Sequence, residues 1–306
     1  MFRALFISLS ENRGLRAFAE KTAIGRRLSS RFVAGMSVEE ALAATAATNQ
    51  KGMSVSVDNL GENVTNLDEA RESARLYHEL IDAIVERKLN ANVSLKLTHM
   101  GLDIDEAVSR TIVNDVVAHA AKRDNFVRID MEGSPYTQKT LDAVRELHRT
   151  PGNAGHVGAV IQSYLHRSER DVEELCAEGI RIRLCKGAYK EPAEIAFQAK
   201  EDVDANFVKL MKILLKSGTY HGIATHDPKM LDATLAFARG ENIAPNAFEF
   251  QMLYGVRRDL QEQLVGDGWG MRVYIPFGTE WYPYLMRRLA ERPANALFIL
   301  RNLFRR

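Results

Sequence analysis

Four polar side chains stand near the ends of four successive apolar segments of this 306-residue chain. They are Lys96, Asp130, Gln162 and Arg183. In most of these segments polar and apolar residues alternate, and a two-residue period places the polar ones on one face of a β-strand. Because such charges are rarely buried unless they are paired or functional, the set predicts a cationic pocket with one carboxylate and one amide. A network of structural ion pairs is the alternative.

Later segments add polar residues to this set. Thr225 and His226 follow one apolar segment, and Tyr274 lies in the last one. The final predicted helix carries four polar residues at spacings that place most of them on one face: Tyr284, Arg287, Arg288 and Glu291. Two guanidinium groups suit an anionic ligand, because each can form bidentate hydrogen bonds. Surface charge is the alternative for this arginine pair.

The chain lacks the motifs of several other chemistries. It has no H-E-x-x-H pair, no Cys/His cluster, no serine nucleophile elbow and no phosphate-binding loop. We therefore expect no metal site, and the remaining polar set favours an organic cofactor together with a small anion. A Schiff-base aldolase or lyase, with Lys96 or Lys186 as the nucleophile, stays open as the second possibility.

The elements that must position these residues alternate regularly. Eight short segments rich in Val, Ile and Leu are predicted strands: 54–59, 92–98, 126–132, 158–164, 180–187, 222–227, 248–254 and 272–278. Amphipathic helices are predicted between them, beginning after Asn66 and near 104, 137, 169, 193, 228 and 257, with a last one from about 280. Asn66 with Glu69, and Ser37 with Glu40, are typical of helix N-termini.

Eight strand–helix units without an intervening linker favour an α/β fold, a closed (β/α)8 TIM-like barrel. We expect a helical N-terminal arm over residues 1–50 and the catalytic barrel over 51–306. A doubly wound open sheet is the alternative, but it would usually carry G-x-G-x-x-G after its first strand. The glycines at 266, 268 and 270 have the wrong spacing and precede a strand. Barrel enzymes keep their chemistry at the carboxyl ends of the strands, where the polar set falls.

Composition excludes other classes of protein. Lys plus Arg number 41 and Asp plus Glu number 40, so the formal charge of +1 predicts no nucleic-acid partner. Two cysteines, Cys176 and Cys185, cannot form a disulfide framework and indicate a reducing compartment. No stretch is apolar enough to span a bilayer. The apolar run at the N-terminus is too short for a secretory signal. The arginine-rich end, residues 287–306, predicts either a solvated closing helix or contact with an anionic membrane surface.

Several segments resemble motifs of the proline dehydrogenase family. Residues 183–189 read RLCKGAY, 284–291 read YLMRRLAE, and 129–132 read IDME. SLKL at 94–97, ATH at 224–226 and FEFQML at 248–253 fit as well. The resemblance runs in order from about residue 50 to the C-terminus, and the first two motifs together are specific. By its length the chain resembles the monofunctional bacterial form.

The resemblance implies a distorted barrel that holds FAD, with the last helix over the barrel mouth. It implies oxidation of L-proline to Δ1-pyrroline-5-carboxylate, with electrons passed to a membrane quinone. Lys96, Arg287 and Arg288 are then expected to hold the substrate carboxylate. The residues expected around the substrate ring are Tyr189, Leu253 and Tyr274.

The same resemblance implies a cofactor site. Arg183 and Gln162 are expected near the reactive part of the flavin, and Asp130 is expected to organise the pocket. The remaining expected FAD contacts are Cys185, Lys186, Gly187, Ala188, Thr225, His226 and Glu291. Two positions depart from the family pattern: Cys185 replaces a common aliphatic residue, and Lys190 replaces a common aromatic one. Neither departure removes a group that the chemistry needs.

The implied partners are L-proline, the membrane quinone and the Δ1-pyrroline-5-carboxylate dehydrogenase that uses the product. We expect a cytoplasmic protein, with peripheral contact to the inner face of the cell membrane as the further possibility.

Overall fold

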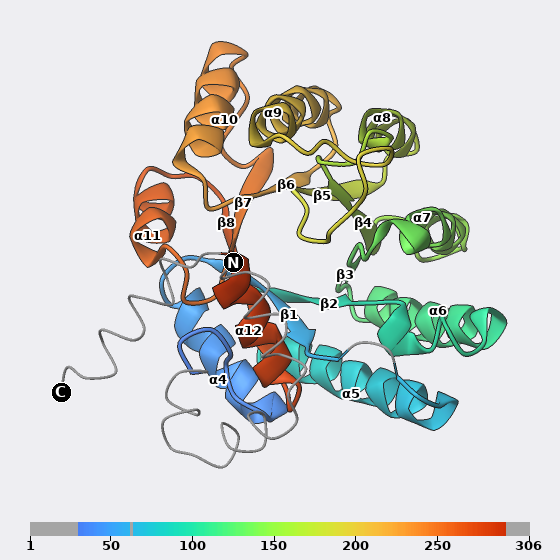
Figure 1. Cartoon of the computed structure of the whole chain (residues 1–306). Coiled ribbons are helices and arrows are strands. Elements are labelled where there is room, and N and C mark those ends of the chain that lie inside the picture. The colour runs from blue at the N-terminus through green and yellow to red at the C-terminus, as the bar shows by residue number, and fades with distance from the viewer. Residues whose placement is uncertain (1–29, 62–63, 292–306) are drawn as a thin grey trace.

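Eight parallel strands close into a barrel in the order β1 to β8 (Figure 1). The structure is a computed structural model that describes residues 30–61 and 64–291, with side chains described up to Met286. The strands are β1 Ser54–Asn59, β2 Ala91–Leu95, β3 Val127–Ile129, β4 Val157–Gln162, β5 Arg181–Cys185, β6 His221–Ala224, β7 Phe248–Leu253 and β8 Met271–Phe277. The predicted (β/α)8 barrel is therefore confirmed.

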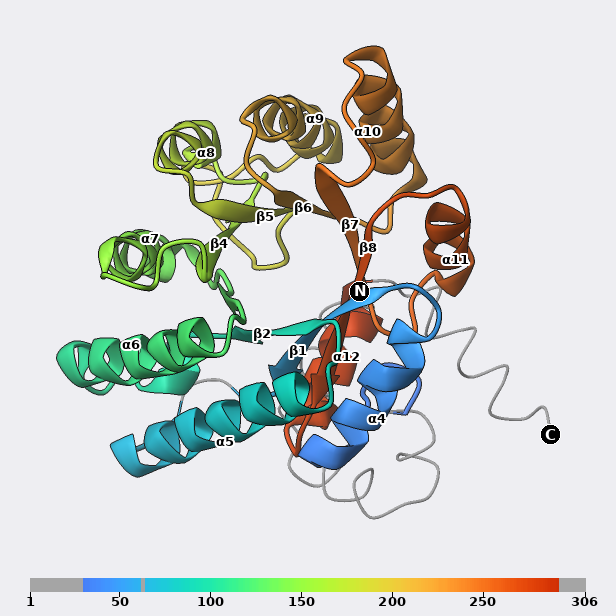
Figure 2. The same cartoon turned by 180° about the vertical axis from the view of Figure 1, so that it is seen from behind.

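Helices form a ring outside the barrel, and the views from the two sides agree on this arrangement (Figures 1 and 2). The ring consists of α5 Leu67–Glu86, α6 Glu106–Lys122, α7 Ser134–Arg149, α8 Ser168–Ala177, α9 Lys200–Lys216, α10 Pro228–Gly240 and α11 Arg258–Gly266. The other two helices, α4 Val38–Asn49 and α12 Trp281–Glu291, lie beside β1 in the gap between α11 and α5. A short 3-10 helix, η1, lies at Thr98–Met100. None of the described helices is long and apolar enough to cross a bilayer.

The alternation of side chains divides each strand between two environments. In β1, Val55 and Val57 belong to the apolar core that the surrounding helices cover. Ser56, from the same strand, instead accepts a hydrogen bond from Arg183 of β5, so it faces the barrel interior. The barrel interior is thus polar, while the layer between the strands and the helices is apolar, as the two-residue period predicts.

Helix N-termini occur where the sequence predicted them. Ser37 and Glu40 form a reciprocal capping box at the start of α4. The Asn66 side chain accepts a hydrogen bond from the Glu69 backbone at the start of α5. Each cap satisfies backbone N–H groups that have no partner within the helix.

All strands except β1 end one to three residues earlier than expected, and in β2 and β3 this changes where the polar residues lie. Strand pairing stops at Leu95 in β2 and at Ile129 in β3, so Lys96 and Asp130 lie immediately beyond the strand ends. The helix expected from about 193 begins at Lys200 instead. Pro192 lies in the intervening loop, and proline favours loops and helix starts over helix interiors.

Two helices from opposite parts of the sequence meet at β1 and β8. Ala41 and Leu42 of α4 join the main core, while the first turns of α12 form a second apolar cluster with Phe32, Val33 and Leu60. Backbone hydrogen bonds from Ala34 to Pro276 and from Leu60 to Phe277 hold these segments together. The predicted domain boundary at residue 50 stays a prediction.

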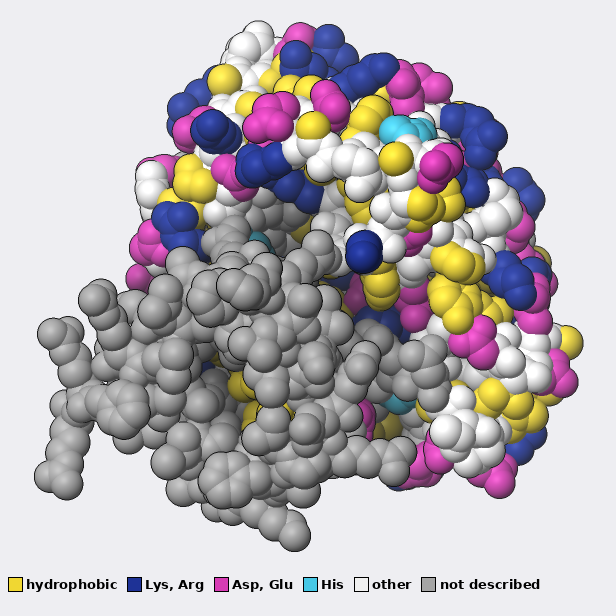
Figure 3. All heavy atoms as spheres, viewed as in Figure 1, with side chains coloured by type: hydrophobic (Ala, Val, Ile, Leu, Met, Phe, Trp, Pro, Cys, Tyr) yellow, Lys and Arg dark blue, Asp and Glu magenta, His cyan; other side chains and the backbone are white. Residues whose placement is uncertain are grey.

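On the face drawn in Figure 3, basic and acidic side chains are interspersed over the described residues.

Candidate active site

Asp130 is the centre of a hydrogen-bonded cluster at the carboxyl end of the strands. Its Oδ1 accepts hydrogen bonds from Ser94 Oγ and from Arg183 Nη1, both at 2.7 Å. Its Oδ2 accepts a hydrogen bond from the Tyr274 hydroxyl at 2.9 Å. The Asp130 backbone N–H bonds to the Leu95 carbonyl at 2.8 Å, which holds the residue against the end of β2. Both carboxylate oxygens therefore have donors.

Arg183 joins four strands through one guanidinium group. Besides Asp130, it donates to Gln251 Oε1 of β7 at 2.5 Å, to Ser56 Oγ of β1 at 3.1 Å and to Ser94 Oγ of β2 at 3.3 Å. The guanidinium lies 5.2 Å from the centre of the Tyr274 ring, within the range of a cation–π contact. Only 8% of the Arg183 side chain is exposed. A planar group with donors on every edge is well suited to such multiple contacts, so its position is strongly fixed.

Lys96 faces two carboxylates at the same end of the barrel. Its Nζ lies 3.5 Å from Asp58 Oδ2 and 4.0 Å from Asp130 Oδ2. Asp58 is almost completely buried at the end of β1, and the Tyr77 hydroxyl of α5 approaches it at 3.4 Å. Burial and the charge of Asp58 raise the pKa of Tyr77 well above its usual value. Tyr77 therefore remains a phenol that donates its proton.

Tyr274 is likewise held in its protonated form. Burial raises its pKa well above the usual value, and the carboxylates of Asp130 and Asp58 raise it further. The charge of Arg183 acts in the opposite direction but is the smaller effect. A phenol in this position donates a hydrogen bond to Asp130 and turns its ring toward the Arg183 side of the pocket.

Gln162, at the end of β4, has one polar atom without a partner. Its Nε2 donates to the Met131 carbonyl at 3.3 Å, but its Oε1 is buried and has no hydrogen-bond donor. The Tyr164 hydroxyl, two residues later, is also buried without a partner. Buried polar atoms without partners are uncommon, because each loses its bonds to water without replacement. These atoms suggest that a ligand supplies the missing partners.

Gly187 allows the chain to pass over the Tyr164 ring. A Cβ at this position would lie 2.2 Å from that ring, and the backbone φ of +110° is one that few other residues adopt. Gly187, Ala188 and Tyr189 are exposed and begin the long loop between β5 and α9. Cys185 accepts a backbone hydrogen bond from Ser163 at 2.7 Å.

A second group of predicted residues lies beside the first one, at the ends of β5, β6 and β7. Lys186 forms ion pairs with Asp204 at 2.5 Å and with Asp227 at 2.7 Å. Asp227 also bonds through its backbone N–H to the Thr225 hydroxyl. Nε2 of His226 accepts a hydrogen bond from the backbone N–H of Leu253 at 2.9 Å.

The structure thus brings together Lys96, Asp130, Arg183 and Tyr274 in one connected cluster. The side chains of Arg287, Arg288 and Glu291 lie outside the described residues, although the backbone of α12 is described through Glu291. Their roles as well as those of Tyr189, Leu253 and the predicted flavin contacts stay predictions.

Sequence reasoning missed four members of the cluster. They are Ser56, Asp58, Ser94 and Gln251. All four follow the alternating pattern: Ser56 and Asp58 alternate with Val55 and Val57, and Ser94 alternates with Val93 and Leu95. Gln251 alternates with two aromatic or apolar neighbours in the same way. The predicted set took one polar residue from each of four strands, Lys96, Asp130, Gln162 and Arg183, and left out the others on the same faces.

The arrangement does not favour the Schiff-base alternative. Lys96 and Lys186 each lie within ion-pairing distance of two carboxylates. An amine nucleophile must present a free electron pair, and an ammonium group that is held between carboxylates offers none.

Comparisons with known proteins agree with this geometry. The family model for proline dehydrogenase matches residues 41–301. Proline dehydrogenase 1 of Bacillus subtilis (strain 168) is 40% identical over 307 residues, which is 100% of both chains. The proline dehydrogenase of Deinococcus radiodurans is 40% identical and covers 91% of this chain and 90% of its own.

A solved structure shows the same architecture within a longer protein. Proline utilization A from Bdellovibrio bacteriovorus, inactivated by N-propargylglycine, superposes with a TM-score of 0.85 at 27% identity. The match covers 100% of this chain and 38% of that one. With a family match over most of its length and full-length relatives at 40% identity, this chain belongs to the proline dehydrogenase family and is an oxidoreductase that acts on proline.

Proposed function

We propose that the enzyme holds FAD and L-proline at the carboxyl end of the barrel, forms Δ1-pyrroline-5-carboxylate and passes the electrons to a membrane quinone. The observation that carries this proposal is the Asp130-centred cluster beside a buried amide oxygen that has no donor. The cluster holds cationic side chains and a phenol in place, and the unpartnered Gln162 Oε1 needs an N–H donor from a ligand. An isoalloxazine ring carries such a group at its edge.

The residues present fit a flavin in two respects. Gln162 offers a buried acceptor, and the Gly187 turn keeps the backbone close to the Tyr164 ring, where a Cβ would clash. Lys186, Thr225 and His226 are held in fixed positions at the neighbouring strand ends. We assign the flavin contacts to this group together with Arg183, Cys185, Ala188 and Glu291. FAD, when bound, accepts a hydride from the proline ring carbon next to the nitrogen.

The protein's own contribution is to orient the substrate. Lys96 would bind the proline carboxylate together with Arg287 and Arg288, so that a cationic group grips one end of a small ring. Tyr189, Leu253 and Tyr274 would pack around the ring and exclude water. Holding the ring carbon in one orientation lowers the entropic cost of reaction, which is the main gain available without a protein nucleophile.

Asp130 organises the pocket and is not the base that deprotonates the substrate amine. Both of its carboxylate oxygens already accept hydrogen bonds from Ser94, Arg183 and Tyr274. These three donors commit the carboxylate to holding its neighbours, and a base must in addition lie within hydrogen-bond reach of the proton that it takes. We therefore assign amine deprotonation to solvent, and Asp130 to the positioning of Arg183 and Tyr274.

Visible spectroscopy of the purified enzyme tests the cofactor. We expect a yellow protein that bleaches when L-proline is added without oxygen, and a noncovalent flavin that acid precipitation releases. Gln162→Ala should weaken flavin binding, whereas Gln138→Ala on the exposed surface of α7 should not. A colourless, folded preparation that FAD cannot reconstitute would contradict the proposal.

We place the enzyme in the cytoplasm, in peripheral contact with the inner face of the cell membrane through its arginine-rich C-terminal end. The Δ1-pyrroline-5-carboxylate dehydrogenase that consumes the product is its proposed partner. The enzyme should sediment with anionic vesicles, more so when proline reduces the flavin and less so at high salt. Absence from the pellet in both redox states at low salt would overturn this placement.

A further inference from the structure

A cavity of about 230 Å³ lies at the end of the barrel opposite the proposed active site. Its lining includes the residues that directly precede β2, β3 and β4, namely Asn90, Phe126 and His156. The amino ends of parallel strands meet at one end of a barrel, so these residues mark the barrel floor. We call this space the floor cavity. Arg128, Arg181, Arg183 and Arg272 also line it.

Two of these four arginines already have carboxylate partners. Arg183 pairs with Asp130 at 2.7 Å, and Arg272 pairs with Glu249 at 2.6 Å. Glu249 is further engaged by the Tyr220 hydroxyl and by Gln251. Both carboxylates therefore have other partners, and the other carboxylate of the lining, Asp124, is exposed and forms no ion pair with Arg128 or Arg181 among the described residues.

Arg128 and Arg181 form no ion pair with any residue in the described part of the chain. Arg128 is 4% exposed and donates to the backbone carbonyls of Ala159 and Arg181. The Arg181 Nε is buried and has no hydrogen-bond acceptor. Both guanidinium groups lie over the Phe126 ring, at 4.7 and 4.4 Å from its centre.

The pKa shifts of the two arginines agree with an excess of positive charge here. Burial lowers the pKa of Arg128, and the charges of Arg183, Arg181 and Arg272 lower it further against the opposing effect of Glu249. Burial also lowers the pKa of Arg181, and the charge of Arg272 adds to this against the opposing effect of Glu249. A buried charge without a counter-charge is costly, because the lost hydration is not replaced. Carbonyl contacts and two aromatic rings, Phe126 and Tyr220, offset only part of that cost.

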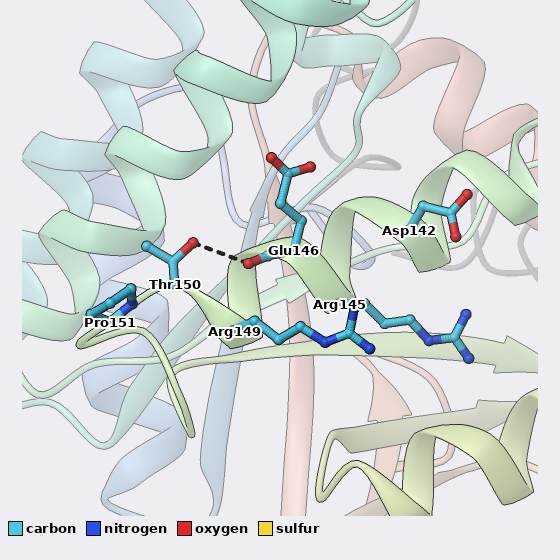
Figure 4. Close-up of a pocket in the computed structure, with 6 residues that line it drawn as sticks. All are labelled: Asp142, Arg145, Glu146, Arg149, Thr150 and Pro151. Carbon is cyan, nitrogen blue, oxygen red and sulfur yellow. Dashed lines mark hydrogen bonds between the residues drawn. The ribbon is translucent and has the colours of Figure 1, made fainter.

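A hollow on the outside of the barrel shows the opposite case. It has a volume of about 520 Å³ and lies along the end of α7 (Figure 4). Its two arginines are Arg145 and Arg149, and both pair with Glu178, with Arg145 also pairing with Glu174. Its charges are already matched, so the hollow gives no reason to expect a ligand.

We propose that the floor cavity is a binding site for one small oxyanion, of the size of phosphate or a short carboxylate, held by Arg128 and Arg181. Guanidinium groups present paired N–H donors that match the oxygen atoms of such an anion. The Arg181 Nε supplies a donor that has no other acceptor. The site is separate from the proline site, because Arg183, two residues further along β5, lies between them.

Thermal unfolding of the flavin-loaded enzyme tests this site. Phosphate, sulfate and succinate are titrated against chloride at constant ionic strength, and the phosphate and succinate arms distinguish tetrahedral from carboxylate anions. We expect a saturable rise in Tm of about 3 °C in at least one arm, in line with binding to the folded state alone. Equilibrium dialysis with radiolabelled anion of that arm should then give about one bound anion per chain.

Three variants separate specific binding from general salt effects. Arg181→Met should abolish the saturable rise, whereas Arg71→Met, at an exposed position on α5, should retain it. Asn90→Asp adds a carboxylate to the lining at an exposed position and should weaken binding at least tenfold, which keeps the test decisive if Arg181→Met fails to fold. A rise in Tm that is linear in salt, or equal in all variants, overturns the proposal, because excluded anions stabilise any folded protein in that way.

Discussion

Asp130→Ala should destabilise the enzyme more than Arg183→Met, although the two residues form one ion pair. The difference follows from what each substitution leaves behind. Without Asp130, the Arg183 guanidinium keeps only neutral acceptors, Gln251, Ser56 and Ser94. Without Arg183, the Asp130 carboxylate keeps two hydroxyl donors and Lys96 at 4.0 Å.

The magnitudes can be worked out from these contacts. The two side chains are 8% and 12% exposed, so the pair is nearly buried. An uncompensated buried charge costs about 3–5 kcal/mol, and we assign that range to Asp130→Ala. Arg183→Met should cost about 1–3 kcal/mol, close to the loss of charge-assisted hydrogen bonds alone. The double variant should cost less than the sum, with a coupling energy of about 2 kcal/mol.

Urea unfolding of the flavin-saturated enzyme at neutral pH measures all three values. The exposed pair Asp68 and Arg71 on α5 serves as the matched control, and its cycle should show no measurable coupling. Equal losses for Asp130→Ala and Arg183→Met, or additive losses in the double variant, would refute the reasoning. Such a result would mean that Arg183 finds another counter-charge when Asp130 is absent.

Three further predictions concern the substrate and pH. Arg287→Met and Arg288→Met should each raise KM for proline while FAD stays bound. The loss in kcat/KM should correspond to about 1.5–3 kcal/mol. Unchanged kinetics in both variants would show that the two arginines are surface charges. Wild-type enzyme should prefer L-proline over trans-4-hydroxy-L-proline by at least about tenfold, and Tyr274→Ser should narrow that gap, so equal wild-type kcat/KM values would contradict a role for Tyr274 in specificity. Burial lowers the pKa of His99 to about 4 and that of His221 to about 3, so both stay neutral in the folded state while the unfolded chain takes up protons below about pH 6.5. Stability should therefore fall as pH drops from 6.5 toward 4, by about 1.4 kcal/mol per unit for each histidine, and His99→Gln should lose its share of that slope in urea unfolding.

Much of the barrel was readable from local patterns. All eight strands occur where short segments rich in Val, Ile and Leu predicted them. Polar and apolar residues alternate in most of them, because one face of each strand meets the helix layer and the other faces the barrel interior. Helix starts at Ser37 and Asn66 were predictable because a cap depends on residues three positions apart. Strand ends were less predictable, since pairing at Leu95 and Ile129 depends on neighbouring strands that are distant in sequence.

The predicted start of α9, near residue 193, was wrong for a similar reason. Residues 193–199 follow the Gly187 turn. The His166 backbone N–H donates a hydrogen bond to the loop after β5, and the Phe197 backbone N–H donates one to the loop after β4. Such contacts join segments about 30 residues apart and override a local helical preference. The partners of Asp130 are a comparable case, because Ser94 and Tyr274 lie 36 and 144 residues away from it.

By itself, the sequence determined the number and order of the strands, the polar character of the barrel interior and the family motifs, because each depends on residues close together in the chain. Tertiary structure decided which charged residues pair with one another. Only the closed barrel shows that Arg183 takes Asp130 as its partner, that Glu249 pairs with Arg272, and that Arg128 and Arg181 are left without a carboxylate among the described residues. Coulomb energy depends on distance in space, and barrel closure sets that distance between residues that the chain keeps far apart.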